Sequence, residues 1–466
     1  MEKIITFIKS SGIYFIGSVL NKIAIVLLLP LYTNKINPAD YGYYDLTMTY
    51  IALITSIFFI DIWTITMREM LGAESEKEKE KYLTNGIFIF LGCVITYTIL
   101  IILFQQFINI KHIFLVYMCG LSTCLQSLYS SCIRGFNLNR IYVLSGVINT
   151  LIMLILNLIF LNILNYGYTS LYISAILGNI VQIIIIEING KILGKIKYNN
   201  FNKTIIKKMF FISLPLCLNS AFYWILFNYN RILISYRLGT YENGLYAVGT
   251  KFSSVLSLIT TCFSLAWQEV AFKNSEENNH LYSKASYLYI NMLLIGVVVS
   301  LPLINIIFPL MIGVEYDAAK YIVPWSILAS VMSIFNVFLG TIFNAIRDNK
   351  SIIIATLLGC IVNVVLVHLL ITKIGVNAAS IAIFFGFFVN VIIRIKILKN
   401  KIQFNINIFK LLKYIPIIGS VSYIYINFGF TINVITMLLS IGIITYINKK
   451  YIVIIYQKVS NKILLK

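Results

Sequence analysis

Long apolar segments run from one end of the chain to the other, separated by short clusters of charged residues, glycine, proline and asparagine. An apolar segment of about 20 residues can cross a bilayer as a helix. Runs such as IAIVLLLPLY and LIMLILNLIF do not alternate between apolar and polar residues, unlike the strands of an outer-membrane barrel. The pattern predicts an all-α polytopic membrane protein with about 14 transmembrane helices, over residues 11–33, 42–67, 84–108, 113–133, 142–164, 168–189, 210–236, 244–270, 285–311, 321–345, 352–372, 378–395, 412–428 and 431–448.

The composition excludes a soluble globule, because 59% of the residues are hydrophobic and 12% charged, against about 45–50% and about 25% in ordinary soluble proteins. The seven cysteines fall in apolar runs without CxxC or cysteine–histidine spacing, so we expect no disulfide framework and no metal. The chain has no phosphate-binding glycine-rich loop, HExxH or GxSxG motif. We therefore predict that it is not an enzyme and needs no cofactor.

The 37 Lys and Arg residues exceed the 17 Asp and Glu residues and give a net charge of +20. In a soluble protein this excess would suggest nucleic acid. Here 29 of the basic residues fall in the tails and connections of one side, including the stretch GKILGKIKYNNFNKTIIKK and the stretch RIKILKNKIQFNINIFKLLK. Because cytoplasmic connections collect Lys and Arg, we predict that both termini are cytoplasmic and that nucleic acid is not a partner. The connections of the other side carry five basic residues: Lys35, Lys111, Arg237, Lys320 and Lys373.

An internal repeat divides the predicted helices into two sets of six. YGYYDLTMTY and NGLYAVGTKF place Gly42 and Tyr44 opposite Gly244 and Tyr246, and two further matches fall at nearly the same offset. A parallel repeat of this kind occurs in transporters that bind their substrate between the halves. We predict an N-terminal lobe over residues 1–200, a C-terminal lobe over 201–400, and an appended helix pair with a cytoplasmic tail over 401–466.

Three basic residues lie inside predicted helices, where a charge is costly unless it is paired, hydrated or functional. Lys22 lies midway along the first helix, and its alternatives are a cavity-lining role or a structural ion pair. Arg231 and Lys251 lie nearer to a membrane surface, so they either line the same cavity or extend to the lipid headgroups. Trp224 and Asn228 share a helix face with Arg231. A cavity with this excess of cations predicts an anionic ligand.

Asp61 is the one acid that the pattern places clearly inside a predicted helix, and Thr64 and Arg68 follow on the same face. Its carboxylate either pairs with a cation or takes up H⁺ or Na⁺ during transport. A single carboxylate does not decide between these alternatives.

Several segments resemble the polysaccharide flippases of the Wzx (O-antigen transporter) type in the MATE/MOP superfamily. These segments are LLLPLYTNKINPADYGYYDL, TITMRE, SLPLCLNSAFYWILFNYNRILISYRLGTYENGLYAVGTKF and NVVLVHLLITKIGVNAASIA. The resemblance implies two six-helix lobes around an alternately opening cavity in the bacterial inner membrane, and basic residues that receive a polyprenyl-pyrophosphate-linked oligosaccharide. Lys22, Arg231 and Lys251 match basic positions of such flippases. The family often has Asp-Arg where this chain has Asn230-Arg231, which implies a less neutralised Arg231.

The sequence thus predicts a flippase for lipopolysaccharide or other surface polysaccharide assembly that acts as a monomer, with other assembly proteins of the membrane as candidate partners. A cation-coupled multidrug exporter of the same superfamily is the first alternative, although the surplus of acids expected of such a pump is absent from the sequence. A membrane polysaccharide polymerase or glycosyltransferase is the second. Its catalytic loops would need more room than connections of about four to ten residues provide.

Overall fold

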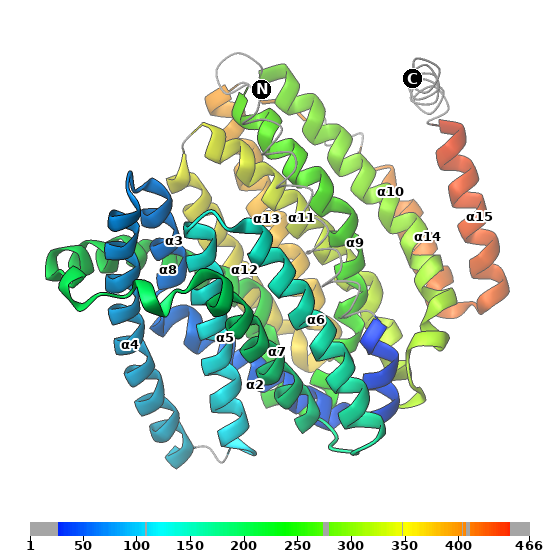
Figure 1. The fold of residues 1–466 in the computed structure, drawn as a ribbon. Helices are drawn as coiled ribbons and strands as arrows, with labels where there is room; N and C mark the ends of the chain where they lie inside the picture. Colours follow the sequence, from blue (N-terminus) through cyan, green and yellow to red (C-terminus); the bar gives the residue numbers. More distant parts are fainter. Residues whose placement is uncertain are drawn as a thin grey trace, which may run out of the picture.

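The computed structural model describes residues 27–107, 110–273, 279–346, 348–402, 404–406 and 411–447. They form long helices, most of them running roughly alongside one another (Figure 1). Every predicted segment from 42–67 onward coincides with a helix or a broken helix, which confirms the all-α membrane fold. The segment 11–33 lies mostly outside the described residues, and its end is helical over residues 27–35. In the described part, eight helices are long and apolar enough to cross a membrane, or ten if each of two bent pairs is one span.

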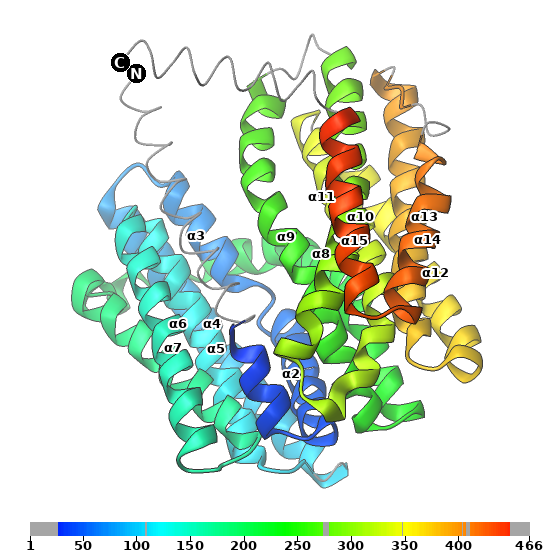
Figure 2. The same cartoon turned by 90° about the vertical axis from the view of Figure 1, so that its right-hand side faces the viewer.

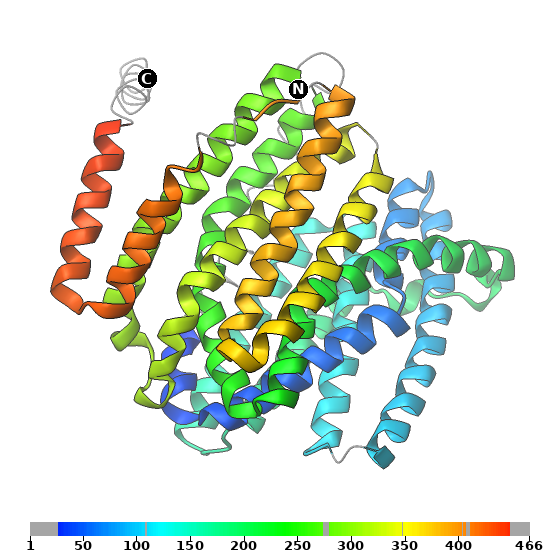
Figure 3. The same ribbon diagram turned by 180° about the vertical axis from the view of Figure 1, so that it is seen from behind.

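The helices form two lobes that stand side by side (Figure 2). The first lobe contains α2 (Pro38–Phe58), α3 (Ile62–Gly72), α4 (Glu76–Phe107), α5 (Ile113–Gly135), α6 (Asn139–Asn162) and α7 (Thr169–Gly190). The second contains α9 (Thr240–Lys273), α10 (Asn279–Met311), η3 (Val314–Ile322), α11 (Val323–Ala345), α12 (Asn349–Ile374) and α13 (Asn377–Ile402). The last two helices, α14 (Tyr414–Asn427) and α15 (Phe430–Ile447), pack on α10, on the side of the molecule opposite α4 and α5 (Figure 3).

Helix α8 (Lys203–Arg237) contacts both lobes. Its parts Lys203–Pro215 and Ser220–Arg237 are inclined by 46°. The bend begins at Pro215, which has no backbone N–H to donate within the helix. In the first part, Lys208 Nζ lies 2.9 Å from Glu69 Oε2 of α3. In the second, Asn230 donates a 3.1 Å hydrogen bond to Asn363 of α12. The predicted boundary between the lobes at residue 200 stays a prediction. Helix α8 begins just after this position and joins the two lobes.

The second predicted segment is broken between α2 and α3, which are inclined by 48°. The break lies at Ile60 and Asp61, whose φ angles of 45° and 52° fall in the left-handed region. That region is unusual for a β-branched residue such as Ile60. The broken helix places the Asp61 carboxylate at the start of α3, in the half of the segment that leads to the lysine-rich connections.

The acidic and basic run GAESEKEKEK, which precedes the predicted segment 84–108, is largely helical. Helix α4 begins at Glu76, eight residues before the predicted apolar segment. Glu76 and Glu78 lie in the first turn, where negative charge is favourable beside the free backbone N–H groups. Lys79 adds a 2.7 Å ion pair to Glu76, one turn away. Polar turns at the lysine-rich ends of the helices therefore continue the helices beyond their apolar cores.

The connections alternate between two ends of the molecule, which we name by their charge. The lysine-poor end holds the connections at Lys35, Lys111, Lys320 and Lys373, and the lysine-rich end holds residues 191–208. At the lysine-poor end α2 of the first lobe packs on α9 of the second.

The crossing of α2 and α9 is made by the two glycines of the internal repeat. A Cβ atom on Gly42 would lie 1.8 Å from the Thr240 carbonyl oxygen, and one on Gly244 would lie 1.9 Å from the Pro38 carbonyl oxygen. Only glycine permits so close an approach of two helix backbones. The repeat-related positions therefore meet each other where the two lobes join.

Candidate functional site

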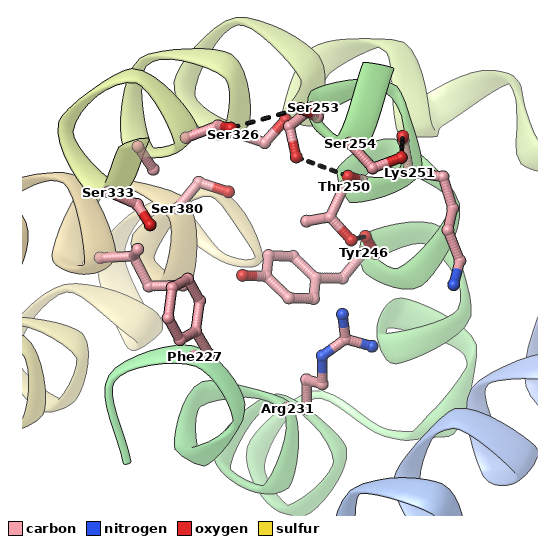
Figure 4. A pocket seen from close by; sticks show the side chains of 13 residues that line it. Phe227, Arg231, Tyr246, Thr250, Lys251, Ser253, Ser254, Ser326, Ser333 and Ser380 are labelled. Atoms are coloured by element: carbon pink, nitrogen blue, oxygen red, sulfur yellow. Dashed lines mark hydrogen bonds between the residues drawn. The ribbon is translucent and has the colours of Figure 1, made fainter. Parts of the chain in front are cut away.

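A pocket lies between α8, α9, α11 and α13 (Figure 4). Its wall combines cations and hydroxyl groups, and the residues that carry its polar character are Arg231, Tyr246, Thr250, Lys251, Ser253, Ser254, Ser326, Ser330, Ser333 and Ser380. Small serine side chains leave space where larger residues would fill it. Several of these hydroxyl groups bond backbone carbonyl oxygens nearby, as when Ser253 donates to the Thr250 carbonyl oxygen at 2.6 Å. The pocket can therefore hold water or a polar ligand within an otherwise apolar bundle.

Arg231 of α8 forms an ion pair with Asp45 of α2, and its Nη1 group donates to both carboxylate oxygens. Both side chains are largely buried, with 17% and 12% of their surfaces exposed. Asn243 of α9 also donates to Asp45 at 3.3 Å and to the Gly42 carbonyl oxygen at 2.9 Å. The guanidinium lies 5.6 Å from the centre of the Tyr246 ring. The pair joins the two lobes beside their glycine crossing.

This ion pair corrects the expectation that Asn230 leaves Arg231 poorly neutralised. The neutralising acid is Asp45, which lies on α2 of the first lobe. The expectation was wrong because sequence spacing reveals partners on one helix, whereas this partner is 186 residues away. Asn230 has a different task and bonds Asn363 and the Ala379 carbonyl oxygen inside the second lobe.

Lys251 lines the same pocket as Arg231 and lies within electrostatic reach of both Arg231 and Asp45. The described residues at this site thus carry two cations and one acid. The structure brings Arg231 and Lys251 to one pocket and adds Asp45, which the sequence-based count of charges had left out. A signal was present, because Asp45 follows Gly42 by three residues and therefore shares its helix face.

Trp224 and Asn228 are not among the described residues that line the pocket. The Trp224 side chain is buried, and its Nε1 group donates a 3.2 Å hydrogen bond to the Thr49 carbonyl oxygen of α2. In this structure Trp224 thus contacts the other lobe, while Asn228 is half-buried on α8. Lys22 lies outside the described residues. The substrate-binding role predicted for these three residues stays a prediction.

Asp61 and Arg68 lie away from the pocket. Asp61 is 16 residues beyond Asp45 and lies past the break between α2 and α3. Its Oδ1 atom accepts a 2.8 Å hydrogen bond from the Thr64 hydroxyl, as the shared face predicts. Within the described residues it makes no ion pair, and the Arg68 side chain is exposed. Structural pairing and H⁺ or Na⁺ coupling both remain predictions for Asp61.

A further cation, Arg394, was missed because it opens a lysine-rich stretch of sequence. The structure places it inside the second lobe with no exposed surface. Its guanidinium donates to the Asn336 carbonyl oxygen at 2.7 Å and to the Thr356 hydroxyl at 3.3 Å, and no described carboxylate forms an ion pair with it. Gly340 lies beside it, where a Cβ atom would be 3.0 Å from the guanidinium.

The first lobe holds a neutral polar network that sequence reasoning also missed. Gln126 of α5 and Asn149 of α6 donate to the Gln182 side chain of α7, at 3.0 and 2.7 Å. Asn149 also donates to Asn179 at 3.3 Å. Amide side chains inside apolar helices were the available signal. In contrast to the second lobe, this network contains no charge.

The comparisons with known proteins agree with this architecture. A family model described as polysaccharide biosynthesis protein matches residues 7–267. A search of curated proteins gave no match. Among solved structures, the lipid II flippase MurJ in an inward closed conformation is similar with a TM-score of 0.71 and 16% identity, over 96% of this chain and 100% of MurJ.

Multidrug resistance MATE family transporters of the MOP superfamily are similar as well. An inward-facing structure gives a TM-score of 0.67 at 14% identity, over 83% of this chain and 94% of the transporter. An outward-facing structure gives 0.59 at 14% identity, over 85% and 96%. At these identities the likeness shows a shared fold.

Proposed function

The chain belongs to the polysaccharide biosynthesis protein family, and we propose that it is a flippase for polyprenyl-pyrophosphate-linked oligosaccharides in the bacterial cytoplasmic membrane. The fold is that of flippase-type transporters, and the similar structures are transporters and not enzymes. The single observation that carries the proposal is the pocket that combines Arg231 and Lys251 with a wall of hydroxyl groups.

The charge of this pocket suits the linkage in the proposed substrate. A pyrophosphate esterified at both ends carries one negative charge on each phosphorus, so two cations can neutralise it. Arg231 offers a guanidinium for bidentate contact with a phosphate, and Lys251 adds a point charge. The serine hydroxyl groups can bond sugar hydroxyl groups. The lipid tail would stay in the bilayer while the polar part passes between the lobes.

The structure also suits one state of an alternating-access cycle. We propose that the lysine-rich end faces the cytoplasm, in accordance with the charge asymmetry of the sequence. The contacts between α2 and α9 then close the outer end. The higher TM-score to the inward-facing than to the outward-facing MATE transporter supports this assignment. H⁺ or Na⁺ coupling through Asp61, at its helix break, belongs to the same proposal.

Removal of both pocket cations should abolish glycan export. In a strain that lacks the gene, we expect surface polysaccharide to disappear and its lipid-linked units to accumulate. The wild-type gene should restore export, whereas Arg231→Gln with Lys251→Gln should reduce it at least about tenfold, because each lost charged hydrogen bond weakens binding by roughly 1.5–3 kcal/mol. Lys22→Ala tests the third predicted cation. Surface glycan and lipid-linked units are the measured quantities, with immunoblots for protein level.

Lys320→Gln is the matched control, because Lys320 lies at the lysine-poor end outside the pocket and its side chain is 31% exposed. It should export normally. Full export by the double variant would contradict the cationic pocket as the substrate site. Normal surface glycan in the deletion strain, together with raised drug sensitivity, would instead support a multidrug exporter, the function of the similar MATE structures.

A further inference from the structure

The Asp45 carboxylate already binds the Arg231 guanidinium, which the proposed function assigns to the ligand. Arg231 Nη1 donates to both Asp45 carboxylate oxygens, although Arg231 also lines the pocket. The Arg231 Nε–H group is buried and has no hydrogen-bond partner among the described residues. Arg231 therefore retains a donor for a second acceptor while Asp45 holds its Nη1 group.

The Asp45 carboxylate comes from α2 of the first lobe and is held in place by its contacts with α8 and α9. Asp45 lies on α2, whereas Arg231 and Lys251 lie on α8 and α9. Asn243 of α9 donates both to Asp45 and to the Gly42 carbonyl oxygen. Each of these bonds crosses the junction of the two lobes at the lysine-poor end. Opening of that end separates α2 from α9 and from the adjoining end of α8, and it therefore breaks them.

We propose that Asp45 is a built-in counter-ion. Its carboxylate helps to close the lysine-poor end, and the phosphate groups of the ligand displace it from Arg231. This inference rests on the proposed function, because it needs an anion at Arg231. With Asp45 in place, the described charges of the site sum to one positive charge. An entering pyrophosphate neutralises both cations and repels the Asp45 carboxylate. Ligand binding thus weakens the closure, and a ligand can shift a conformational equilibrium only through such differential contacts.

The same arrangement explains why the empty protein stays closed. Without ligand, opening would leave the Arg231 guanidinium and the Asp45 carboxylate without each other in a largely buried place, which is costly. With ligand, the guanidinium keeps an anionic partner throughout. The carboxylate therefore links occupancy of the pocket to opening of the far side and disfavours opening of an empty transporter.

Two measurements on purified protein test the displacement. The first is the affinity for farnesyl pyrophosphate, with farnesol as the uncharged probe. The second is the distance between spin labels on Lys111→Cys and Tyr236→Cys, after replacement of the seven native cysteines. Both positions are exposed at the lysine-poor end, Lys111 between α4 and α5 of the first lobe and Tyr236 near the end of α8, which packs on α12 of the second. Farnesyl pyrophosphate should lengthen the distance in the wild type, and farnesol should not.

Asp45→Asn should bind farnesyl pyrophosphate at least about fivefold more tightly, because the competing carboxylate no longer reduces the fraction of free Arg231. Its label distance should already be long without ligand. Asp317→Asn is the control, because Asp317 is an acid at the lysine-poor end with a 66% exposed side chain. It should match the wild type in both measurements.

The outcomes separate this inference from the proposed function. If Arg231→Gln binds farnesyl pyrophosphate as tightly as the wild type, the anion pocket itself is wrong. If Arg231→Gln binds more weakly but Asp45→Asn binds no more tightly and stays closed, the pocket stands and the counter-ion role is overturned. Should Asp45→Asn fold poorly, Asp45→Glu provides the second variant. Its longer side chain keeps the charge, so a wild-type response to ligand would support the proposal, and loss of the response would overturn it.

Discussion

Gly244→Ala is expected to abolish transport by holding the lysine-poor end open. A Cβ atom on this residue would lie 1.9 Å from the Pro38 carbonyl oxygen, whereas ordinary contacts of a Cβ atom are 3.4–4 Å. Backbone atoms of two packed helices cannot yield as a flexible side chain can, so α2 and α9 would have to separate by about 1.5 Å. Asp45 lies one helical turn from Gly42, and its bonds to Arg231 and Asn243 would lengthen too.

Three quantities check this expectation: surface glycan in the complemented deletion strain, protein level, and the distance between labels at positions 111 and 236. We expect glycan export near that of the empty vector, normal protein level and a long label distance. Gly92→Ala in α4 is the matched control, because no atom would lie within 4 Å of its Cβ. It should export normally and gain up to about 1 kcal/mol of helix stability. Wild-type export by Gly244→Ala with a short label distance would contradict a crossing that requires glycine.

The sequence predicted the helices well because bilayer-spanning segments are long and apolar, a property that each segment carries on its own. It located the ends less well, as at Glu76, because polar turns can be helical or irregular with similar ease. The break at Ile60 and Asp61 was missed because the residues around it remain apolar. Neither proline nor glycine marks it.

The internal repeat indicates more than a duplication, because two of its matched positions contact each other in the structure. Gly42 and Gly244 were matched because they occupy equivalent positions, and the structure shows that they contact each other's helices. Equivalent positions meet when they lie next to the axis that relates the two lobes. Sequence alone does not show which repeated positions lie there, since this depends on how the lobes pack.

The candidate site was predicted in part, for a related reason. Arg231 and Lys251 lie on consecutive helices, so their proximity in the pocket follows from short connections. Asp45 approaches from the other lobe, and Arg394 turns into its own lobe from a lysine-rich segment. Both depend on contacts between distant segments. The two arginines differ in a way that matters for stability. Arg231 has a largely buried carboxylate partner, whereas Arg394 forms no ion pair with a described acid.

Arg231→Met is therefore expected to destabilise the protein strongly, whereas Arg394→Met should be nearly neutral. Removal of Arg231 leaves the Asp45 carboxylate as an unpaired charge, and the loss of one partner of a buried ion pair costs about 3–5 kcal/mol. Replacement of Arg394 by an apolar residue of similar length leaves no described carboxylate without its partner, and it removes a buried charge whose desolvation is itself costly. The melting temperature of each variant in detergent measures the difference. Equal losses in the two variants would contradict it.

Exchange of the two charges, Asp45→Arg together with Arg231→Asp, completes the test. The exchanged pair can form between the same two helices, so we expect it to recover most of the melting temperature that Arg231→Asp alone loses. Transport should nevertheless stay absent, because α8 would then present a carboxylate to the pyrophosphate. Recovery of stability without transport separates the closure of the lobes from the binding of the anion. Wild-type transport by the exchanged protein would show that Arg231 does not receive the ligand.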